Sequence, residues 1–266
     1  MKTIAIVCDC DNTLTHDSTS LLIKSNGIDV DQFWKKIDGM VKNGWDPPIA
    51  WMNEICSLIK EGKIAQNTNE KLTEFGKTVE TFPGVTEFIP ELNTKLKENG
   101  VDAKVEGYVV SCGMEHLMKG TKIAETFTDI FGSKFYEENG KIAGMKSSVT
   151  FTEKTKFLFA INKGITSELR QDPFIVNKTF EERRIPFENM IYLGDGPSDI
   201  PCFAALKRKG GKAIGIKVEK EWHKEFEQEM YRRDVPTYKA DNTEGRELRE
   251  ELEKTARDVL KKWDNK

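Results

Sequence analysis

An apolar run near the start of the chain, from Ile4 to Cys8, ends abruptly at two aspartates, Asp9 and Asp11. A short run of this composition is typical of a buried β-strand, and Asn12 then favours a turn. Because successive side chains of an extended strand alternate between faces, residues i and i+2 point to the same side. The pattern therefore predicts that both carboxylates share one crevice at the carboxyl end of the strand, where open α/β sheets bind their ligands.

Two carboxylates this close repel each other unless a cation neutralises them or one of them holds a proton. The arrangement suits a Mg²⁺ site that combines a carboxylate nucleophile with a proton donor. Aspartates also begin ordinary loops after strands, so the pair alone leaves both interpretations open. Other polar segments must decide between them.

Size and charge limit the architecture and the partners of the chain. Its 266 residues are enough for one substantial core with a smaller second unit. The 41 basic and 44 acidic residues are interspersed and give a formal net charge of −3, so the overall charge provides no field for nucleic acid. We expect a small-molecule partner and neither nucleic acid nor a membrane.

Compartment and thiol chemistry follow from what the sequence contains. The first apolar stretch is too short for a signal peptide and no run approaches a membrane span, so a cytoplasmic location is expected. The 5 cysteines are odd in number and form no Cys-x-x-Cys pair, which disfavours both a disulfide framework and a zinc site. We expect reduced thiols, with Cys8 and Cys10 packed in or near the first strand.

The region from Ser18 to Thr81 has helical periodicity and no convincing strand. Its apolar residues recur at helical spacing, as in Phe33, Trp34, Ile37, Met40 and Val41 and then Ile49, Met52, Ile55 and Ile59. We predict an all-helical unit over 18–81, inserted into one α/β core domain made of residues 1–17 and 82–266. The aromatic residues Phe33, Trp34, Trp45 and Trp51 are expected in the interior of the inserted unit.

The remainder of the chain alternates expected strands with expected helices, which is typical of a parallel sheet covered on both faces. Strands are predicted over 106–111, 190–193 and 213–216, and a hairpin over 134–145 with its turn at Asn139-Gly140. Helices are predicted over 85–98, 113–128, 153–162 with Thr152 as cap, 219–233 as a solvated helix, and 244–263. The fold class is therefore α/β, a doubly wound parallel sheet with a helical insertion.

Polar chemistry also follows later strands. Ser111-Cys112-Gly113 ends one of them, and the segment 194–199, Gly-Asp-Gly-Pro-Ser-Asp, follows another. Lys154 lies between these segments near a helix start, and it is preferred over Lys156 because residues +3, +4 and +7 from it are apolar. Phosphoryl transfer to a carboxylate requires such a set: a nucleophile, a hydroxyl beside a glycine turn, a cation and a second acidic cluster.

In their order and context, these segments resemble the haloacid dehalogenase superfamily, specifically its Asp-x-Asp-x-Thr phosphatases. Residues 9–13, Asp-Cys-Asp-Asn-Thr, match the first motif, Ser111 the second, Lys154 the third and residues 194–199 the fourth. The resemblance covers nearly all of the chain and implies a Rossmannoid core with a helical cap of the C1 type. It is greatest to the phosphoserine phosphatase branch.

The resemblance implies a Mg²⁺-dependent phosphomonoester hydrolase. Asp9 would attack the phosphorus to form an aspartyl-phosphate, and Asp11 would act as general acid and then as general base. The ion would be held by Asp9, the backbone carbonyl of Asp11 and Asp195. Asp199 would complete the metal site by orienting waters or Lys154.

The same resemblance assigns the phosphate-binding groups. The Ser111 hydroxyl and the backbone N–H groups around Cys112 and Gly113 would bind phosphate oxygens. Lys154 would neutralise the phosphate and so reduce its repulsion of Asp9.

Two departures and two alternatives remain. The phosphoserine phosphatase branch holds the substrate amine with a glutamate nine residues after the nucleophile, where this chain has Ser18, so the substrate is expected only to be a small phosphorylated metabolite. The segment 162–188, between the third and fourth motifs, is longer than in a minimal family member. We expect it to shape the entrance to the site. The alternatives are a phosphotransferase or mutase that uses the same intermediate, and a non-catalytic phosphate- or protein-binding module. Asp11 disfavours dehalogenation, because dehalogenating relatives lack the second acid.

Overall fold

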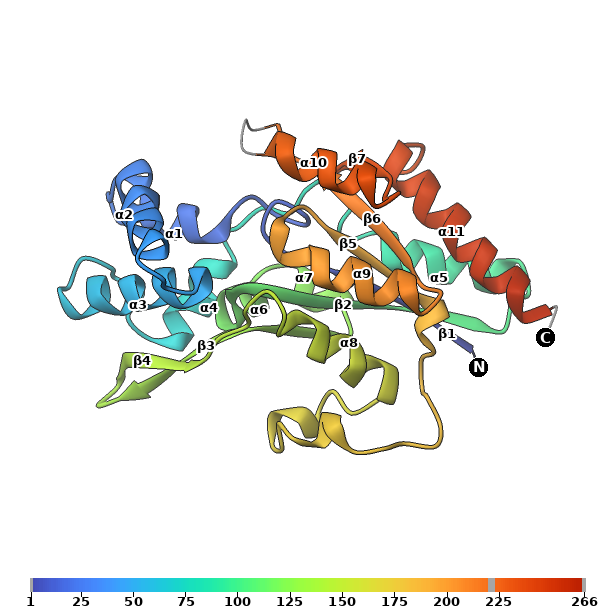
Figure 1. The fold of residues 1–266 in the computed structure, drawn as a ribbon, viewed down its shortest axis with the longest axis horizontal. Helices are drawn as coiled ribbons and strands as arrows, with labels where there is room; N and C mark the ends of the chain where they lie inside the picture. The colour runs from blue at the N-terminus through green and yellow to red at the C-terminus, as the bar shows by residue number, and fades with distance from the viewer. Residues whose placement is uncertain (1, 220–222, 265–266) are drawn as a thin grey trace.

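The structure is a computed structural model that describes residues 2–219 and 223–264, and a seven-stranded sheet forms its centre (Figure 1). The strand order is β4-β3-β2-β1-β5-β6-β7, and every neighbouring pair is parallel except β3 and β4. The strands are β1 (Lys2–Cys8), β2 (Ala103–Met114), β3 (Asp129–Glu138), β4 (Lys141–Ser147), β5 (Met190–Gly194), β6 (Lys212–Lys217) and β7 (Thr237–Lys239). The predicted α/β class with a mainly parallel sheet is confirmed.

Alternation along β1 feeds two separate cores, one on each face of the sheet. Ile4 and Ile6 pack with α5 (Phe88–Glu98) and α11 (Glu247–Asp264) on one face. Ala5 and Val7 pack with α8 (Lys154–Lys163), α9 (Ile200–Arg208) and α10 (His223–Arg232) on the other. Because both faces of β1 are covered, its residues form a continuous apolar run, and the strand can deliver polar groups only beyond its end.

Four helices follow β1 in the chain, before α5 leads into β2. They are α1 (Ser18–Ser25), α2 (Val30–Lys42), α3 (Pro47–Lys60) and α4 (Asn69–Gly76), and side chains of Asp17, Asp29, Asp46 and Thr68 cap their first turns. The chain leaves and re-enters the core side by side, since Thr15 pairs antiparallel with Thr81.

The four helices share a third hydrophobic cluster with the β3–β4 hairpin and with α6 (Glu115–Gly120). Helices α4 and α6 approach so closely that a Cβ atom on Gly120 would lie 1.9 Å from the carbonyl oxygen of Thr73. The helical insertion therefore rests on the β2–β4 side of the sheet, at the end where the strands finish (Figure 1).

The predicted helix over 113–128 is wrong at its start and in its middle. β2 continues to Met114, because that residue pairs with Ser133 of β3, and the helical part divides into α6 and α7 (Ile123–Thr126). The hairpin prediction is confirmed: Asn139 and Gly140 have φ angles of 50° and 72°, as a tight two-residue turn requires.

Two further expectations need correction. Thr152 does not cap α8 through its side chain; its carbonyl instead accepts hydrogen bonds from Thr155. Trp45 is 42% exposed, whereas Phe33 and Trp51 are buried as expected and Trp34 is partly buried.

The helix predicted over 219–233 is observed as α10, and residues 220–222 lie outside the described residues. It is not simply a solvated helix, because His223, Phe226 and Met230 are buried in it. The contacts of His223 bear on the site described below.

Residues 162–188 form short turns that pack beside α8. Arg184 pairs with Glu106 of β2, and Arg170 with Asp129 at the start of β3. These ion pairs anchor the segment beside the amino halves of the two strands rather than at their carboxyl ends.

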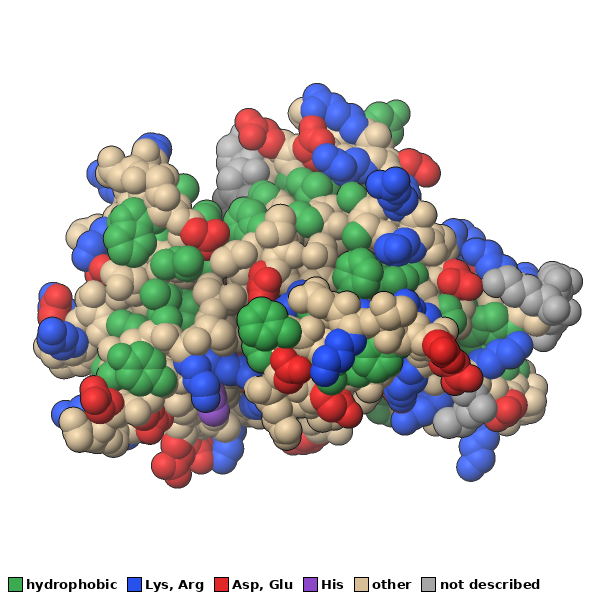
Figure 2. Space-filling view, turned by 60° about the horizontal axis from the view of Figure 1, so that its bottom comes forward, with side chains coloured by type: hydrophobic (Ala, Val, Ile, Leu, Met, Phe, Trp, Pro, Cys, Tyr) green, Lys and Arg blue, Asp and Glu red, His purple; other side chains and the backbone are tan. Residues whose placement is uncertain are grey.

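Acidic and basic side chains are interspersed on the face shown in Figure 2, as the sequence composition suggested. No helix in the described part of the chain is long and apolar enough to cross a membrane.

Candidate active site

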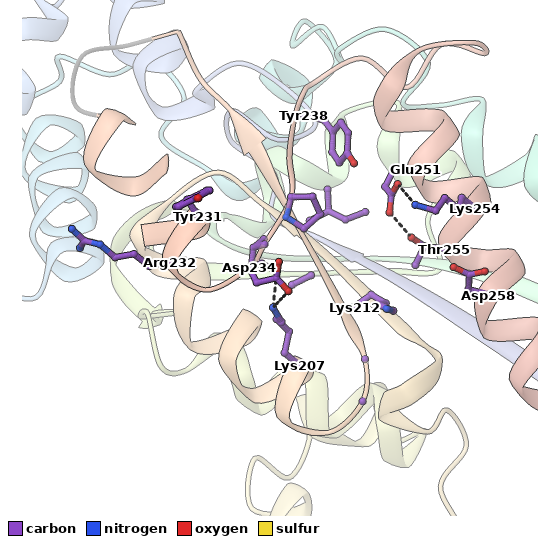
Figure 3. Close-up of a pocket in the computed structure, with 16 residues that line it drawn as sticks. Lys207, Lys212, Tyr231, Arg232, Asp234, Tyr238, Glu251, Lys254, Thr255 and Asp258 are labelled. Carbon is purple, nitrogen blue, oxygen red and sulfur yellow. Dashed lines mark hydrogen bonds and ion pairs between the residues drawn. The ribbon is translucent and has the colours of Figure 1, made fainter. Parts of the chain in front are cut away.

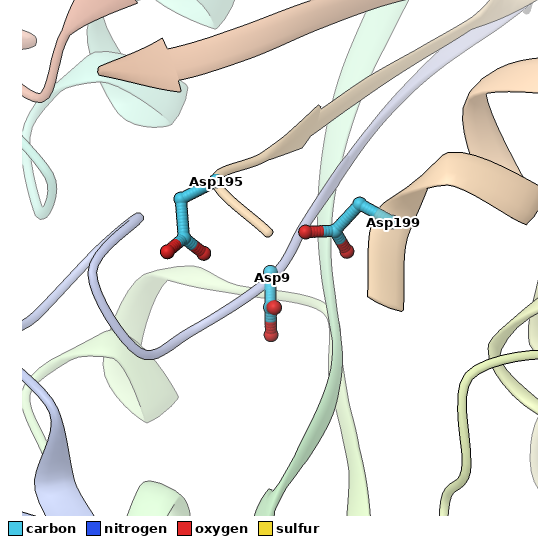
Figure 4. Close-up of side chains that lie close together, drawn as sticks. All are labelled: Asp9, Asp195 and Asp199. Carbon is cyan, nitrogen blue, oxygen red and sulfur yellow. The ribbon is translucent and has the colours of Figure 1, made fainter. Parts of the chain in front are cut away.

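Three aspartates meet where β1 and β5 end. β1 and β5 are neighbours in the sheet, and the backbone N–H of Asp9 donates to the carbonyl of Leu193 at 2.9 Å. One carboxylate oxygen from each of Asp9, Asp195 and Asp199 lies within 4.8 Å of the others, and all three residues are buried. Figure 4 shows Asp9 and Asp195 beyond the two strand ends and Asp199 at the start of the helix that follows β5. The site predicted at the end of the first strand therefore also contains the fourth motif, residues 194–199.

Lys154 is the cation of this cluster. Its Nζ lies 2.6 Å from Asp9 Oδ2, 2.7 Å from Asp199 Oδ1 and 2.9 Å from the hydroxyl of Ser198. The side chain is fully buried, whereas Lys156 pairs with Glu153 near the surface, as the apolar stripe of α8 predicted. Burial alone would lower the pKa of Lys154, but the carboxylates of Asp199 and Asp9 outweigh it and raise that pKa well above its ordinary value. The amine is therefore charged.

Asp199 is held by more donors than the other two acids. Its Oδ1 accepts from Lys154 and from the hydroxyl of Tyr192 at 2.8 Å, and its Oδ2 accepts from the backbone N–H of Gly196 at 3.0 Å. A carboxylate with this many partners is fixed in orientation. Its position fits the predicted task of orienting Lys154 and waters at a metal site.

Asp195 is fixed at both its side chain and its backbone. Thr13 donates its hydroxyl to Asp195 Oδ1 at 3.3 Å, and the His223 ring Nε2 lies 2.8 Å from the carbonyl oxygen of Asp195. Burial, with the charges of Asp9 and Asp199 nearby, raises the pKa of Asp195 well above its ordinary value.

Asp11 faces the second motif rather than the three-aspartate cluster. A Cβ atom on Gly113 would lie 3.0 Å from Asp11 Oδ2 and 3.3 Å from Ser111 Oγ, so a larger residue would crowd both polar atoms. The backbone N–H of Ser18, in the first turn of α1, donates to Asp11 Oδ1 at 2.8 Å. Burial and the charge of Asp17 raise the pKa of Asp11 to about 7. The structure thus brings the first and second motifs together.

The second motif presents its polar groups from the extended end of β2. Ser111 is buried, and its Oγ accepts from the N–H of Gly113 at 3.1 Å. The carbonyl of Cys112 accepts from Ser133 at 2.7 Å. Burial raises the pKa of the Cys112 thiol to about 12, which leaves it protonated and argues against a cysteine nucleophile. Cys8 and Cys10 are buried free thiols, as predicted.

The sequence did not predict the contacts that four residues make in the site. Tyr192 was assigned only to a strand and His223 only to a solvated helix, whereas Thr13 and Ser198 lay inside recognised motifs without a role. A single hydroxyl in the apolar run 190–193 was the signal for Tyr192. The sequence around His223 contains no comparable signal.

The donor set fits a hard divalent cation. The cluster offers carboxylate oxygens alone, and three buried carboxylates face one ammonium group, which leaves an excess of negative charge. Mg²⁺ prefers such oxygen ligands, and buried charges persist in proteins when they are paired or bind a metal. The carboxylate of Asp9 accepts two hydrogen bonds and that of Asp195 one, against three for Asp199, so Asp9 and Asp195 keep more lone pairs for the ion. The backbone carbonyl of Asp11 stays a prediction.

Two hollows lie outside this cluster. One of about 620 Å³ adjoins the turn after Asp11 and is lined by Asn12, exposed His16 and Asp17 on one side and by residues after β6 and β7 on the other. The other, about 1040 Å³, is lined by Lys212, the first residue of β6. It therefore lies near the amino ends of the strands, away from the aspartates (Figure 3). Some of the charged groups that line this second hollow form ion pairs with each other, as Glu251 does with Lys254 and Lys207 with Asp234.

Comparison with known structures gives the architecture a name. A HAD-family hydrolase from Salmonella enterica subsp. enterica serovar Typhi superposes with a TM-score of 0.59 at 14% identity, over 89% of this chain and 67% of that one. A substrate-bound phosphoserine phosphatase superposes with a TM-score of 0.57 at 20% identity, over 96% of this chain and 99% of that one. The chain has the haloacid dehalogenase fold.

Sequence comparison adds a relative without a described activity. An uncharacterized protein of Borreliella burgdorferi is 29% identical over 229 residues, which are 76% of this chain and 78% of that protein. No protein-family model matches the chain. In this haloacid dehalogenase fold, the contacts described above place the candidate active site at the carboxyl ends of β1, β2 and β5 and at the start of α8.

Proposed function

We propose that the protein is a Mg²⁺-dependent phosphomonoester hydrolase that works through an aspartyl-phosphate on Asp9. The observation that carries this proposal is the placement of the Asp9 carboxylate between a buried lysine and two further aspartates at the strand ends. A hydrogen bond of 2.7 Å from the backbone N–H of Cys10 also fixes Asp9 Oδ1. The occurrence of the same fold in a phosphoserine phosphatase supports it.

In the first step, a carboxylate oxygen of Asp9 attacks the phosphorus of the substrate. The bond from phosphorus to the leaving oxygen breaks, its electron pair stays on that oxygen, and Asp11 supplies the proton. Lys154 offsets the negative charge that approaches Asp9. The hydroxyl of Ser111, oriented by the N–H of Gly113 that donates to it, and the N–H group of Cys112 bind the phosphoryl oxygens.

In the second step, Asp11 takes a proton from a water molecule whose oxygen attacks the phosphorus. The bond between phosphorus and Asp9 breaks, inorganic phosphate leaves, and the carboxylate of Asp9 is regenerated. Asp9 and Asp195, with the Asp11 carbonyl and waters oriented by Asp199, would hold Mg²⁺, which supplies positive charge to the phosphoryl oxygens when bound.

The proposal takes residues 18–81 as a cap of the C1 type over a core made of 1–17 and 82–266. The contact between Ser18 and Asp11 links the first cap helix directly to the proton donor. A helical cap over the carboxyl ends of the strands favours a small phosphorylated metabolite as substrate, because the covered site excludes bulky partners and bulk water while it admits the single attacking water molecule.

Hydrolysis of para-nitrophenyl phosphate with Mg²⁺ or with EDTA tests the proposal. We expect turnover that requires the metal, that disappears in Asp9→Asn, and that leaves a phosphate on the Asp9 peptide after rapid acid quenching. Turnover that survives in Asp9→Asn would contradict the assignment of Asp9 as the nucleophile.

Product analysis separates the alternatives. Transfer of phosphate to an added alcohol in preference to water would indicate a phosphotransferase. Binding of phosphate with no turnover over a panel of phosphorylated sugars, amino acids and nucleotides would indicate a binding module.

A further inference from the structure

His223 connects a helix outside the four motifs to the aspartate loop of the site. It is the first residue of α10, its side chain is 1% exposed, and its ring packs on Phe226 with centroids 5.1 Å apart. Its Nε2 lies 2.8 Å from the backbone carbonyl oxygen of Asp195. The other buried residues of α10, Phe226 and Met230, are apolar, so His223 is the polar exception on the buried face of this helix.

The direction of this hydrogen bond follows from the chemistry of its two atoms. A carbonyl oxygen can only accept, so the Nε2 atom of His223 must carry the proton and donate. The contact therefore requires a proton on Nε2, while Nδ1 lies 3.6 Å from Glu227 Oε1.

Three contacts together fix the loop that carries Asp195. His223 holds its carbonyl, Thr13 holds its carboxylate at 3.3 Å, and the N–H of Gly196 is held by Asp199 at 3.0 Å. The contacts from Thr13 and Asp199 come from within the motifs, whereas the contact from His223 reaches the loop from α10. Without it, the carbonyl of a buried residue would lose its partner, which costs about 1–3 kcal/mol and loosens the loop.

We propose that His223 is a positioning residue for divalent-metal binding, which holds the Asp195 loop so that the Asp195 carboxylate faces Asp9. The inference rests on the metal site of the proposed function. Groups that orient metal ligands from outside the ligand set typically contribute about 10–100-fold to metal affinity.

Binding of Mn²⁺ to the full-length, EDTA-treated protein tests this proposal without any need for turnover. The loss of the free Mn²⁺ signal in electron paramagnetic resonance gives the dissociation constant directly. His223→Phe keeps an aromatic ring but no donor, and we expect its Mn²⁺ affinity to fall by at least about 10-fold. His223→Gln keeps an N–H donor at a similar reach and should restore most of the affinity.

Met230→Leu is the matched control, because Met230 is buried in the same helix two turns beyond His223, and the change alters the packing of α10 without removing the ring on which His223 packs. Its Mn²⁺ affinity should equal that of the unmodified protein. With substrate, His223→Phe should raise the Mg²⁺ concentration needed for half-maximal activity and leave kcat at saturating Mg²⁺ nearly unchanged.

Equal Mn²⁺ affinity in His223→Phe and the unmodified protein would overturn the proposal. If His223→Phe does not fold, His223→Asn replaces it: the shorter amide cannot reach the carbonyl, so equal binding by the Asn and Gln variants would overturn the proposal too. Failure of the proposed function looks different, because the unmodified protein would then bind Mn²⁺ through Asp195 yet hydrolyse no phosphate ester. Mn²⁺ binding that Asp195→Asn leaves intact contradicts both.

Discussion

Two groups of buried carboxylates on the same sheet differ in how their charge is balanced. In the amino half of β2, Glu106 accepts two hydrogen bonds from Arg184 and one from the hydroxyl of Tyr108, at 2.6–2.8 Å. At the carboxyl ends of β1 and β5, three carboxylates surround the single ammonium of Lys154. Lys104 lies 3.4 Å from Glu106 as well, so the first group has no unbalanced negative charge, whereas the second has a surplus of it.

The pKa values of the two groups move in opposite directions. Burial opposes ionisation of Glu106, but the hydrogen bonds from Arg184 and Tyr108 outweigh it and lower the pKa of Glu106 to about 2. Burial and neighbouring charges raise the pKa of Asp195 well above its ordinary value. A satisfied ion cluster supports the fold, whereas an unbalanced one needs a cation or a ligand and marks a place for chemistry.

The largest expected effect comes from removing the one cation of the site. Lys154→Met should reduce kcat by at least about 100-fold, a loss typical of removing one preorganised electrostatic contact to the transition state. In EDTA it should also lower the free energy of unfolding by about 3–5 kcal/mol, because Asp9 and Asp199 lose a buried partner. Steady-state kinetics and urea unfolding measure the two losses.

Lys156→Met is the control for Lys154, since Lys156 lies on the same helix and pairs with Glu153 near the surface, away from the aspartates of the site. It should change the free energy of unfolding by less than about 1 kcal/mol and leave kcat unchanged. Equal losses in both variants would mean that burial of Lys154 beside Asp9 has no special consequence.

Removing Arg184, the nearer of the two cations beside Glu106, should affect stability alone. Arg184→Met leaves the Glu106 carboxylate without its two charged hydrogen bonds, which should cost about 2 kcal/mol of unfolding free energy. The cluster lies at the amino half of β2, so kcat and KM for a phosphate ester should not change. A fall in kcat without a fall in stability would erase the distinction between the two groups.

The pH dependence of stability should separate the clusters more finely. A glutamate whose pKa is depressed on folding stabilises the protein above its unfolded pKa, and this contribution disappears as pH falls through the folded value. For Glu106 the window runs from the ordinary 4.5 down to about 2. Above this pH window, urea unfolding should give the unmodified protein a higher free energy of unfolding than Glu106→Gln. This difference should disappear as the pH approaches the lower limit of the window. An advantage that is independent of pH would contradict the assignment.

Local patterns were sufficient to predict most of the site. Asp9 and Asp195 end apolar strands, and Lys154 heads an apolar helical stripe, so each could be placed from its own neighbours. The parallel sheet then brings the strand ends together without further information. The predicted proximity of these segments is confirmed by the distances around Lys154.

The rest of the fold and site depends on pairings between distant segments. β2 extends through Gly113 to Met114 because Ser133 of β3 pairs there, and no local signal distinguishes that extension from a helix start. His223 meets Asp195 across 28 positions of the sequence, through a path fixed by α9, β6 and the packing of α10. Such contacts become visible only when the chain has folded.

The surplus of buried negative charge is tested most directly by the unfolding free energy of Asp195→Asn, measured in EDTA and again with Mg²⁺. The variant should be at least as stable as the unmodified protein in EDTA, because one of the mutually repelling carboxylates is gone. Mg²⁺ at about 100 times its dissociation constant should add about 2.7 kcal/mol to the unmodified protein and little to the variant. Equal stabilisation of both proteins by Mg²⁺, or a marked loss of stability of the variant in EDTA, would contradict the account.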